Sequence, residues 1–179
     1  SIDVMLSQEE ISFRNEFKAF LEELDLSFIL RMDKENEKEF PKDFVRVLGQ
    51  NNYLGIPLPK NVGGRGLNTV CAILAEEELG ALAFPLGCAM GMSTYLCRAI
   101  YKYGTPELWK KYIIPTMKAD LICAEGITEP LKGSDIARLQ TIAKREGNHY
   151  IITGEKRFQK GGIGADWFLT FARPNSEVA

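Results

Sequence analysis

Histidine is almost absent from this chain of 179 residues, and its four cysteines do not occur in close pairs. The one histidine, His149, follows Glu-Gly-Asn in a segment typical of an exposed hairpin turn. Zinc sites need several closely spaced cysteine and histidine ligands, so the sequence predicts no metal centre. The cysteines lie in apolar runs, where reduced and buried thiols are common, and this favours a reducing compartment such as the cytoplasm. They are Cys71, Cys88, Cys97 and Cys123.

The chain also lacks an excess of positive charge and any long apolar run. Lysine and arginine number 22 against 24 acidic residues, for a net charge of −2, so no basic surface is expected to bind nucleic acid. No apolar stretch approaches the roughly 20 residues that cross a bilayer, so no membrane span is expected. Residues 1–5 show no basic segment followed by an apolar one, and we therefore expect no signal peptide.

Residues 1–119 carry the patterns of helices. Ser7 and Glu10 have the spacing of a capping box, and apolar residues then recur at helical spacing as far as Leu24. Residues 33–39 are polar and carry both charge signs, which indicates a solvated connection. The prolines and glycines of residues 54–66 indicate a loop. Further helices are expected over residues 41–49, over 69–79 with a stop at Gly80, over 85–103, and from Thr105 onward with Leu108, Tyr112, Ile113 and Met117 facing the core.

Two features of these helices raise the question of a site. Glu76, Glu77 and Glu78 are adjacent and therefore point in different directions, so they cannot converge on one ion and are expected on a solvated face. Small residues recur from position 87 to position 93. They allow close approach of either another helix or a ligand chain, and both interpretations stay open.

From Leu121 onward the pattern changes to strands. A hairpin is expected over residues 139–153 around the Gly147-Asn148 turn, followed by a short strand over 156–159. Another strand is expected over 166–173, with Trp167, Leu169 and Phe171 on one side. The sequence therefore predicts an α+β fold, with an all-α helical domain over residues 1–119 and a β-domain over residues 120–179.

Residues 125–135 hold the densest polar chemistry of the chain. An apolar run leads into two hydroxyl residues, several carboxylates and a glycine turn. Such a loop presents backbone N–H groups and short side-chain donors, which suit a ligand with carbonyl and phosphate oxygens. A turn with helix-cap chemistry uses the same residue types, so both interpretations remain at this point.

Three motifs, in order and in spacing, resemble those of the acyl-CoA dehydrogenase family. Thr128-Glu129-Pro130-x-x-Gly133-Ser134-Asp135 is similar to the family's TEPxxGSD signature. Residues 54–66 resemble its LGIPIPEEYGGxG turn, and residues 154–167 resemble its GxKxWITNG segment. The resemblance covers essentially the whole chain, but family members are about twice as long. It implies that the chain is the front half of such an enzyme and that its β part is an incomplete, small β-barrel domain.

The resemblance also implies FAD as the cofactor and an acyl-CoA as the substrate. It assigns the hydroxyl of Thr128 and the backbone of Ile127 and Thr128 to the polar edge of the flavin. Gly133 belongs to the same loop. Ser134 is assigned to the cofactor and to the thioester arm of the substrate. Phe158 takes the place of a tryptophan that covers the flavin, with a place in the ordinary core as the alternative. The catalytic glutamate of the family lies beyond Ala179, so no catalytic residue is expected in this chain.

Several positions depart from the family pattern at the cofactor. Glu125 stands where a tyrosine or phenylalanine is frequent, and Lys132 stands where a small residue is usual. Gln159 and Lys160 replace an Ile-Thr pair whose threonine contacts the flavin. Lys160 either approaches the reactive edge as a cation or points to solvent.

Three functions are consistent with this sequence. The first is an FAD-dependent acyl-CoA dehydrogenase; the second is a non-catalytic, dehydrogenase-like subunit or binding module of a mixed oligomer. The third is a related acyl-CoA oxidase or reductase. The resemblance further implies electron-transfer flavoprotein or a similar acceptor as partner and a homo-oligomer, a dimer or a tetramer. It places the protein in the cytoplasm or the mitochondrial matrix.

Overall fold

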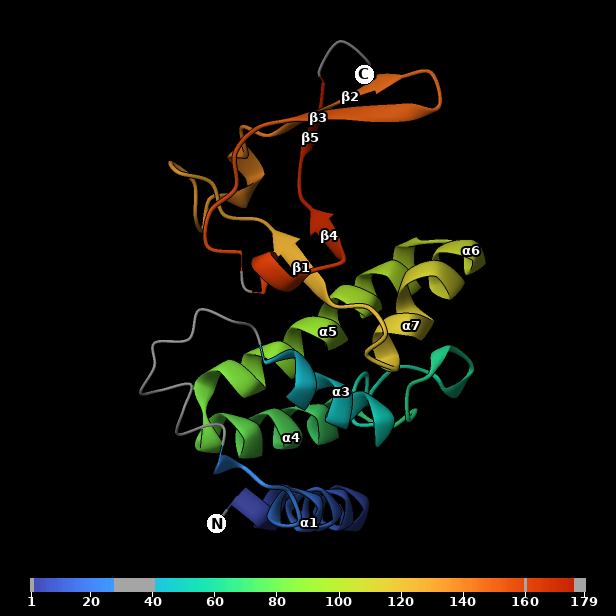
Figure 1. Ribbon diagram of the computed structural model, residues 1–179, viewed down its shortest axis with the longest axis vertical. Helices are drawn as coiled ribbons and strands as arrows, with labels where there is room; N and C mark the ends of the chain where they lie inside the picture. The colour runs from blue at the N-terminus through green and yellow to red at the C-terminus, as the bar shows by residue number, and fades with distance from the viewer. Residues whose placement is uncertain (1, 28–40, 160, 176–179) are drawn as a thin grey trace.

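The computed structural model describes residues 2–27, 41–159 and 161–175 and shows a helical region followed by a region of β-strands (Figure 1). The expected α+β class is confirmed. Among the described residues, no helix combines the length and the apolar character needed to cross a membrane. The longer helices are α1 (Gln8–Glu22), α3 (Lys42–Gln50), α4 (Thr69–Leu82) and α5 (Phe84–Tyr103).

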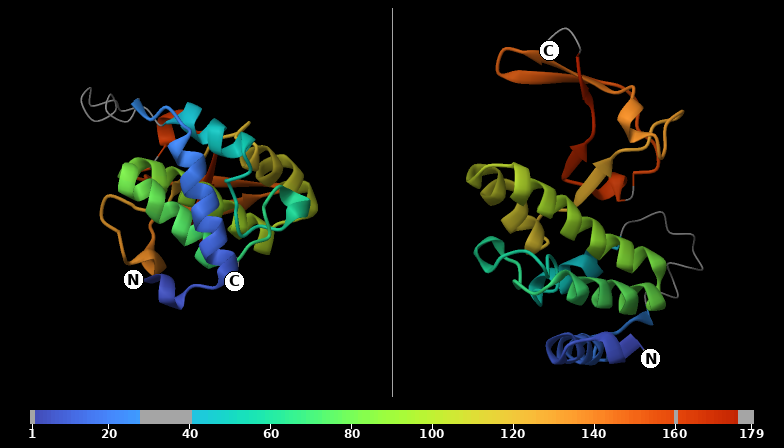
Figure 2. Two further views of the ribbon diagram at one scale, coloured as in Figure 1. Left: turned by 90° about the horizontal axis from the view of Figure 1, so that it is seen from below. Right: turned by 180° about the vertical axis from the view of Figure 1, so that it is seen from behind.

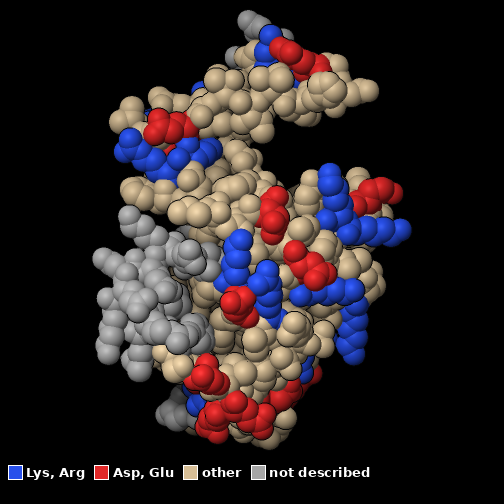
Figure 3. Space-filling view, viewed as in Figure 1, with Lys and Arg blue, Asp and Glu red and all other residues tan. Residues whose placement is uncertain are grey.

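Helices α4 and α5 lie side by side, and α1 crosses them on the outer side, as the views in Figures 1 and 2 show. The core lies between these helices, α3 and the loop that follows α3. In Figure 3 acidic side chains gather over α1, while both charge signs are mixed over the other helices of this face. Fully buried side chains of the core include Phe17, Leu48, Leu54, Ile56, Leu79, Leu86, Met90 and Leu96.

Helix α1 begins at the expected capping box. The Ser7 hydroxyl accepts a hydrogen bond from the backbone N–H of Glu10, and the Glu10 carboxylate accepts one from the backbone N–H of Ser7. One face of the helix is buried through Phe13, Phe17 and Leu21, which recur every four residues. The capping box therefore fixes the start of the helix, and the apolar stripe fixes the face that meets the core.

The loop between α3 and α4 is held against α1 by Arg65. Its guanidinium donates to Glu16 Oε1 at 2.8 Å and lies 5.2 Å from the centres of the Phe13 and Tyr53 rings. The phenol of Tyr53 donates to the same carboxylate oxygen at 2.9 Å. The hydrogen bond from Arg65, and the smaller effect of Tyr53, lower the pKa of Glu16 against the opposing effect of burial.

The helices differ from the sequence expectation in two places. Helix α4 continues through Gly80 to Leu82, because its backbone packs closely on α5. The contact is so close that a Cβ added to Gly87 of α5 would lie 3.3 Å from the backbone nitrogen of Gly80. The fifth expected helix is built as α6 (Pro106–Leu108), a widened π turn η3 (Trp109–Ile113) and α7 (Ile114–Met117). Pro115 has no N–H for the regular i→i−4 pattern, which accounts for the widened turn before it. Leu108 is 39% exposed rather than part of the core.

The strands form two sheets. Strand β1 (Cys123–Gly126) pairs in parallel with β4 (Trp167–Thr170). The other sheet has the order β3-β2-β5, with β2 (Ile142–Glu146) and β3 (His149–Thr153) forming the expected hairpin and β5 (Arg173–Pro174) parallel to β2. Short 3₁₀ turns complete the structure: η1 (Ile2–Met5), η2 (Lys60–Val62), η4 (Ile136–Arg138) and η5 (Gly162–Gly164).

Two expectations for the strands are wrong. Residues 156–159 form no strand, because the backbone N–H of Arg157 donates to Thr128 O at 2.8 Å and Phe158 has a positive φ. The single strand over 166–173 is divided into β4 and β5, since the chain leaves one sheet for the other at that point. The polar connection at 33–39 lies outside the described residues.

Two glycine-to-alanine substitutions should change stability in opposite directions. A Cβ on Gly64 would lie 2.1 Å from the backbone oxygen of Leu58, so we expect Gly64→Ala to lower the free energy of unfolding by about 1–3 kcal/mol or more. A Cβ on Gly80 meets nothing within 4 Å, and Gly80 lies inside a helix, so Gly80→Ala should raise the free energy of unfolding by about 0.5–1 kcal/mol. Urea denaturation of both variants measures the two changes in the free energy of unfolding. Equal effects of the two substitutions would contradict the packing described here.

Candidate functional site

Strand β1 delivers the loop of residues 127–135 to the junction of the helical and strand regions. The backbone N–H of Ile122 donates to Asp166 Oδ2 at 2.7 Å, and the N–H of Asp166 donates to Ile122 O at 2.8 Å. These reciprocal bonds fix the start of the β1–β4 pair. Strand β4 is held to the helices by Trp167, whose indole N–H donates to Thr116 Oγ1 at 3.0 Å. The loop therefore begins from a backbone that is tied to both regions.

A buried carboxylate, Glu129, holds this loop in shape. It accepts hydrogen bonds from the backbone N–H of Gln140 at 2.6 Å and from the N–H and hydroxyl of Thr141 at 2.8 and 2.6 Å. It also forms an ion pair with Lys156 Nζ at 3.0 Å. Burial acts to raise the pKa of Glu129, but these hydrogen bonds outweigh it and lower the pKa to about 2. The carboxylate thus joins three segments that are far apart in the sequence.

The carbonyl groups at the start of the loop are already bonded, whereas its donors have no partner in the part of the chain that the structure describes. Ile127 O accepts from Lys156 Nζ at 3.0 Å, and Thr128 O accepts from the N–H of Arg157 at 2.8 Å. The N–H groups of Ile127 and Thr128 and the Thr128 hydroxyl donate to no residue that the structure describes. Both residues are half-buried. The loop therefore presents donors alone, which fits the carbonyl and nitrogen acceptors along the polar edge of a flavin.

Phe158 lies beside this loop through the bond between Arg157 and Thr128. Its φ is 59°, a left-handed conformation that costs about 1–3 kcal/mol for a bulky residue. Its ring is 83% exposed, so the alternative of an ordinary core residue is wrong. An exposed aromatic ring in a strained backbone is typical of a ligand-binding position.

The remaining predicted residues of this loop are open to solvent. Gly133 and Ser134 are exposed, and a Cβ on Gly133 would meet nothing within 4 Å. Lys132 is half-buried and forms an ion pair with Asp135 at 3.6 Å. Lys160 lies outside the described residues.

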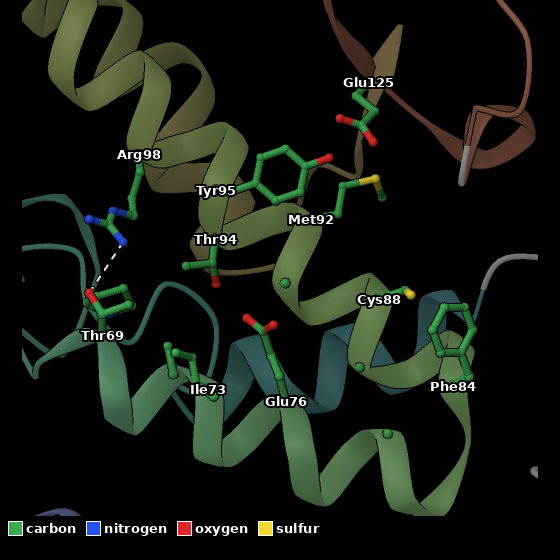
Figure 4. Close-up of a pocket in the computed structure, with 15 residues that line it drawn as sticks. Thr69, Ile73, Glu76, Phe84, Cys88, Met92, Thr94, Tyr95, Arg98 and Glu125 are labelled. Carbon is green, nitrogen blue, oxygen red and sulfur yellow. Dashed lines mark hydrogen bonds between the residues drawn. The ribbon is translucent and has the colours of Figure 1, made fainter. Parts of the chain in front are cut away.

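A cavity of about 420 Å³ lies between α4, α5 and β1 (Figure 4). This volume is within the range of small-molecule sites. Glu125 of β1 and Tyr95 of α5 face each other at one end. Burial, followed by a hydrogen bond to Glu125, raises the pKa of Tyr95. Glu125 is separated from the loop by Gly126 alone, so β1 leads from the lining of the cavity to the segment that carries the donors of Ile127 and Thr128. Apolar lining residues include Ile73, Phe84 and Met92.

The sequence carried a partial signal for this cavity. Gly87 and Gly91 both line it, so the small residues of α5 serve close helix packing and also leave open space. The expectation of a solvated face for the three glutamates is correct only for Glu77, which is exposed. Glu76 lines the cavity, and Glu78 forms an ion pair with Arg14 at 2.7 Å.

Two family models match the chain. The model described as the acyl-CoA dehydrogenase N-terminal domain matches residues 7–120, and the one described as the middle domain matches residues 124–179. A short-chain specific acyl-CoA dehydrogenase of Clostridium acetobutylicum is 37% identical over 172 residues, which are 96% of this chain and 45% of the relative. The chain thus spans less than half the length of this curated relative.

Solved structures show the same likeness. A glutaryl-CoA dehydrogenase from Mycobacterium smegmatis in complex with FADH2 superposes with a TM-score of 0.86 at 26% identity, over 97% of this chain and 44% of that one. A chain in a structure described as the electron transferring flavoprotein of Acidaminococcus fermentans has a TM-score of 0.86 at 29% identity, over 96% of this chain and 45% of that one.

The charge of Glu129 should make stability depend on pH in acid. Its folded-state pKa of about 2 lies below the usual value of 4.5, so its stabilising effect is complete above pH 4.5 and is lost as the pH falls towards 2. We expect Glu129→Gln to be less stable than the natural protein at neutral pH and the gap to shrink over that interval. Unfolding free energies measured by urea titration at several pH values test this. Glu155→Gln, which removes an exposed carboxylate next to Lys156 in the sequence, is the control and should leave the pH profile unchanged. A gap that stays constant down to pH 2 would contradict the assignment.

Proposed function

This chain belongs to the acyl-CoA dehydrogenase family, and from that premise we propose that it supplies the N-terminal and middle domains of an FAD-dependent enzyme that oxidises an acyl-CoA thioester. The observation that carries the proposal is that the donors at Ile127 and Thr128 are unbonded among the described residues, in the segment that follows Glu125 of the cavity between α4, α5 and β1. The family likeness names the cofactor and the substrate class. The donors supply the physical means to hold that cofactor.

The residues of the loop would bind and orient the flavin. The N–H groups of Ile127 and Thr128, together with the Thr128 hydroxyl, donate to the polar edge of the ring. Donors fixed in a half-buried place stabilise negative charge that develops on the group they bind. When bound, FAD accepts the hydride that leaves the acyl group. The ring of Phe158 lies beside this edge and would cover the flavin face.

Glu129 and Lys156 act as positioning residues. Neither presents a free polar atom to the ligand, because the Glu129 side chain is 1% exposed and the Lys156 ammonium is bonded to Glu129 and to Ile127 O. Their hydrogen bonds instead fix the direction in which the Ile127 and Thr128 donors point. Ser134, which is exposed on the same loop, is proposed to meet the thioester arm of the substrate.

The cavity beside Glu125 is proposed as the place of the acyl group. Its lining surface is more apolar than polar and comes largely from two packed helices, which suits a hydrocarbon chain. The proton-abstracting glutamate of the family belongs to a C-terminal domain that neither matched range covers. The described residues therefore bind and orient, and proton removal is assigned to that further domain.

The electron acceptor and the assembly are proposed from the same likeness. Electron-transfer flavoprotein or a similar carrier would reoxidise the flavin, and a homo-oligomer is the proposed assembly. Analytical ultracentrifugation measures the number of subunits in that assembly.

FAD binding is the first test. We expect the FAD-loaded holoprotein to be yellow and to release its flavin on denaturation, because the donors form hydrogen bonds and no covalent link is proposed. FAD is added, unbound FAD is removed by gel filtration, and the absorbance of the protein fraction at the flavin band measures the FAD that stays bound. A protein that remains colourless would favour a non-catalytic binding module instead. Rapid oxygen consumption by the reduced flavin would favour an oxidase.

A second test concerns the Thr128 hydroxyl. Thr128→Val keeps the shape and removes the donor, whose bond to a charged group contributes about 1.5–3 kcal/mol. If this bond favours the reduced, anionic flavin, the midpoint potential should fall by about 30–60 mV, since about 30 mV corresponds to 1.4 kcal/mol for two electrons. Redox titration of the holoenzyme measures the shift. Thr153→Val on the exposed strand β3 is the control. An unchanged potential with a lower melting temperature would make Thr128 a turn residue only.

A further inference from the structure

The inner wall of the cavity is formed where a carboxylate of α4 meets bare backbone of α5. A Cβ on Gly91 would lie 2.9 Å from Glu76 Oε2 and 3.1 Å from Oε1, so the carboxylate fills the space that a side chain at position 91 would take. A Cβ on Gly87 would lie 3.0 Å from the backbone oxygen of Glu76. Figure 4 shows the Glu76 side chain pointing from α4 towards α5, into the cavity.

This carboxylate has no partner among the described residues. No hydrogen bond or ion pair of Glu76 is present there, whereas its neighbour Glu78 is bonded to Arg14 at 2.7 Å. Among the residues that line the cavity, Arg98 is the one with a fixed positive charge. It lies over the start of α4 in Figure 4, where it donates to Thr69 Oγ1 at 3.4 Å. Burial alone raises the pKa of Glu76, and no cation offsets it.

We propose that Glu76 is a specificity-determining residue that restricts the substrate to acyl groups with an uncharged end and rejects those that end in a carboxylate. The inference rests on the proposed function, because it takes the cavity as the place of the acyl group. It adds a rule for the substrate that is set by this chain's own residues.

The physical reason is repulsion without compensation. Two carboxylates that share a half-buried site cannot both be charged without a large cost, and Arg98, the fixed positive charge of the lining, bonds to Thr69 and does not pair with Glu76. A hydrocarbon end meets no such cost. It contacts Ile73, Phe84 and Met92, whose surfaces gain from being removed from water. The same cavity therefore favours a neutral acyl group and opposes a carboxyacyl group.

Geometry supports a role at the end of the acyl group rather than at the thioester. Glu125 of β1 is two residues before Ile127 in the chain, so under the proposed function the reacting carbons lie on the Glu125 side of the cavity. Glu76 projects from α4 into the cavity, whereas Glu125 lies beyond Tyr95 in Figure 4. A substrate whose thioester is near Glu125 would direct its tail towards Glu76.

The test compares two thioesters that share a five-carbon chain: valeryl-CoA, which ends in a methyl group, and glutaryl-CoA, which ends in a carboxylate. Dissociation constants for the FAD-bound holoenzyme are measured by isothermal titration calorimetry, so that the readout does not depend on turnover. We expect valeryl-CoA to bind at least about tenfold more tightly. Glu76→Gln, which keeps the size and removes the charge, should reduce this preference by about tenfold, mainly by tighter binding of glutaryl-CoA.

Glu77→Gln is the matched control. It removes the same charge from the adjacent position of the same helix, but its side chain is exposed and points away from the cavity. We expect it to leave the preference between the two thioesters unchanged. If Glu76→Gln and Glu77→Gln had the same effect, the net charge of the protein would explain the preference, and the proposal would be overturned.

The outcomes separate this inference from the proposed function. If both thioesters bind with equal affinity to the natural holoenzyme, or if glutaryl-CoA binds more tightly, the role of Glu76 is refuted while the acyl-CoA function stands. If neither thioester binds, the proposed function is refuted and this inference with it. If Glu76→Gln loses affinity for both thioesters alike, Glu76 is a structural residue of the helix pair and the proposal fails.

Discussion

The buried Glu129 carboxylate is the interaction on which the loop of residues 127–135 depends. It receives hydrogen bonds from the adjacent residues Gln140 and Thr141 and an ion pair from Lys156, so its partners come from two separate parts of the chain. A buried charge is costly unless it is fully bonded, and removal of one partner leaves the others without compensation. The loop is therefore held as a unit: the conformation of Ile127 and Thr128 cannot change without disturbing this cluster.

A second constraint is the close contact of α4 and α5. Glycines at positions 87 and 91 allow the α4 backbone and the Glu76 side chain to approach α5 more closely than any other residue would permit. The cost of glycine inside a helix is offset by this packing, since α5 still runs unbroken over 20 residues. The same glycines leave the space that becomes the cavity. One set of residues thus determines both the stability of the helix pair and the shape of the candidate acyl site.

Much of the fold followed from local signals in the sequence. The capping box at Ser7, the hairpin around Gly147 and the loop after β1 each depend on residues that are close in sequence, and all three are present. Helix α4 was misjudged at Gly80 because the contact with Gly87 that outweighs the helix-breaking tendency of glycine is a tertiary one. The absence of a strand at Arg157 has a similar origin, since its N–H is bonded to a loop 29 positions earlier in the chain, as is the side chain of Lys156.

The candidate site was less accessible to sequence reasoning. The motif of residues 128–135 located the loop and its donors, but the role of Lys156 as its anchor requires the fold. The cavity was indicated only by small residues that are equally typical of helix packing. Glu76 was assigned to solvent, because a run of three glutamates has no local feature that separates the half-buried Glu76 from its exposed neighbour Glu77.

The parallel pairing of β1 with β4 has a consequence for the order in which the protein folds. Ile122 and Asp166, which begin this pair, are 44 residues apart, whereas the β2–β3 hairpin forms between neighbours. Pairing of distant strands requires closure of a long loop and is slow compared with local hairpin formation. The hairpin and the Glu129 cluster lie within the segment that this closure joins. During synthesis, β1 can therefore take its final place only after β4 has been made, so a chain released before that point would lack the completed candidate site.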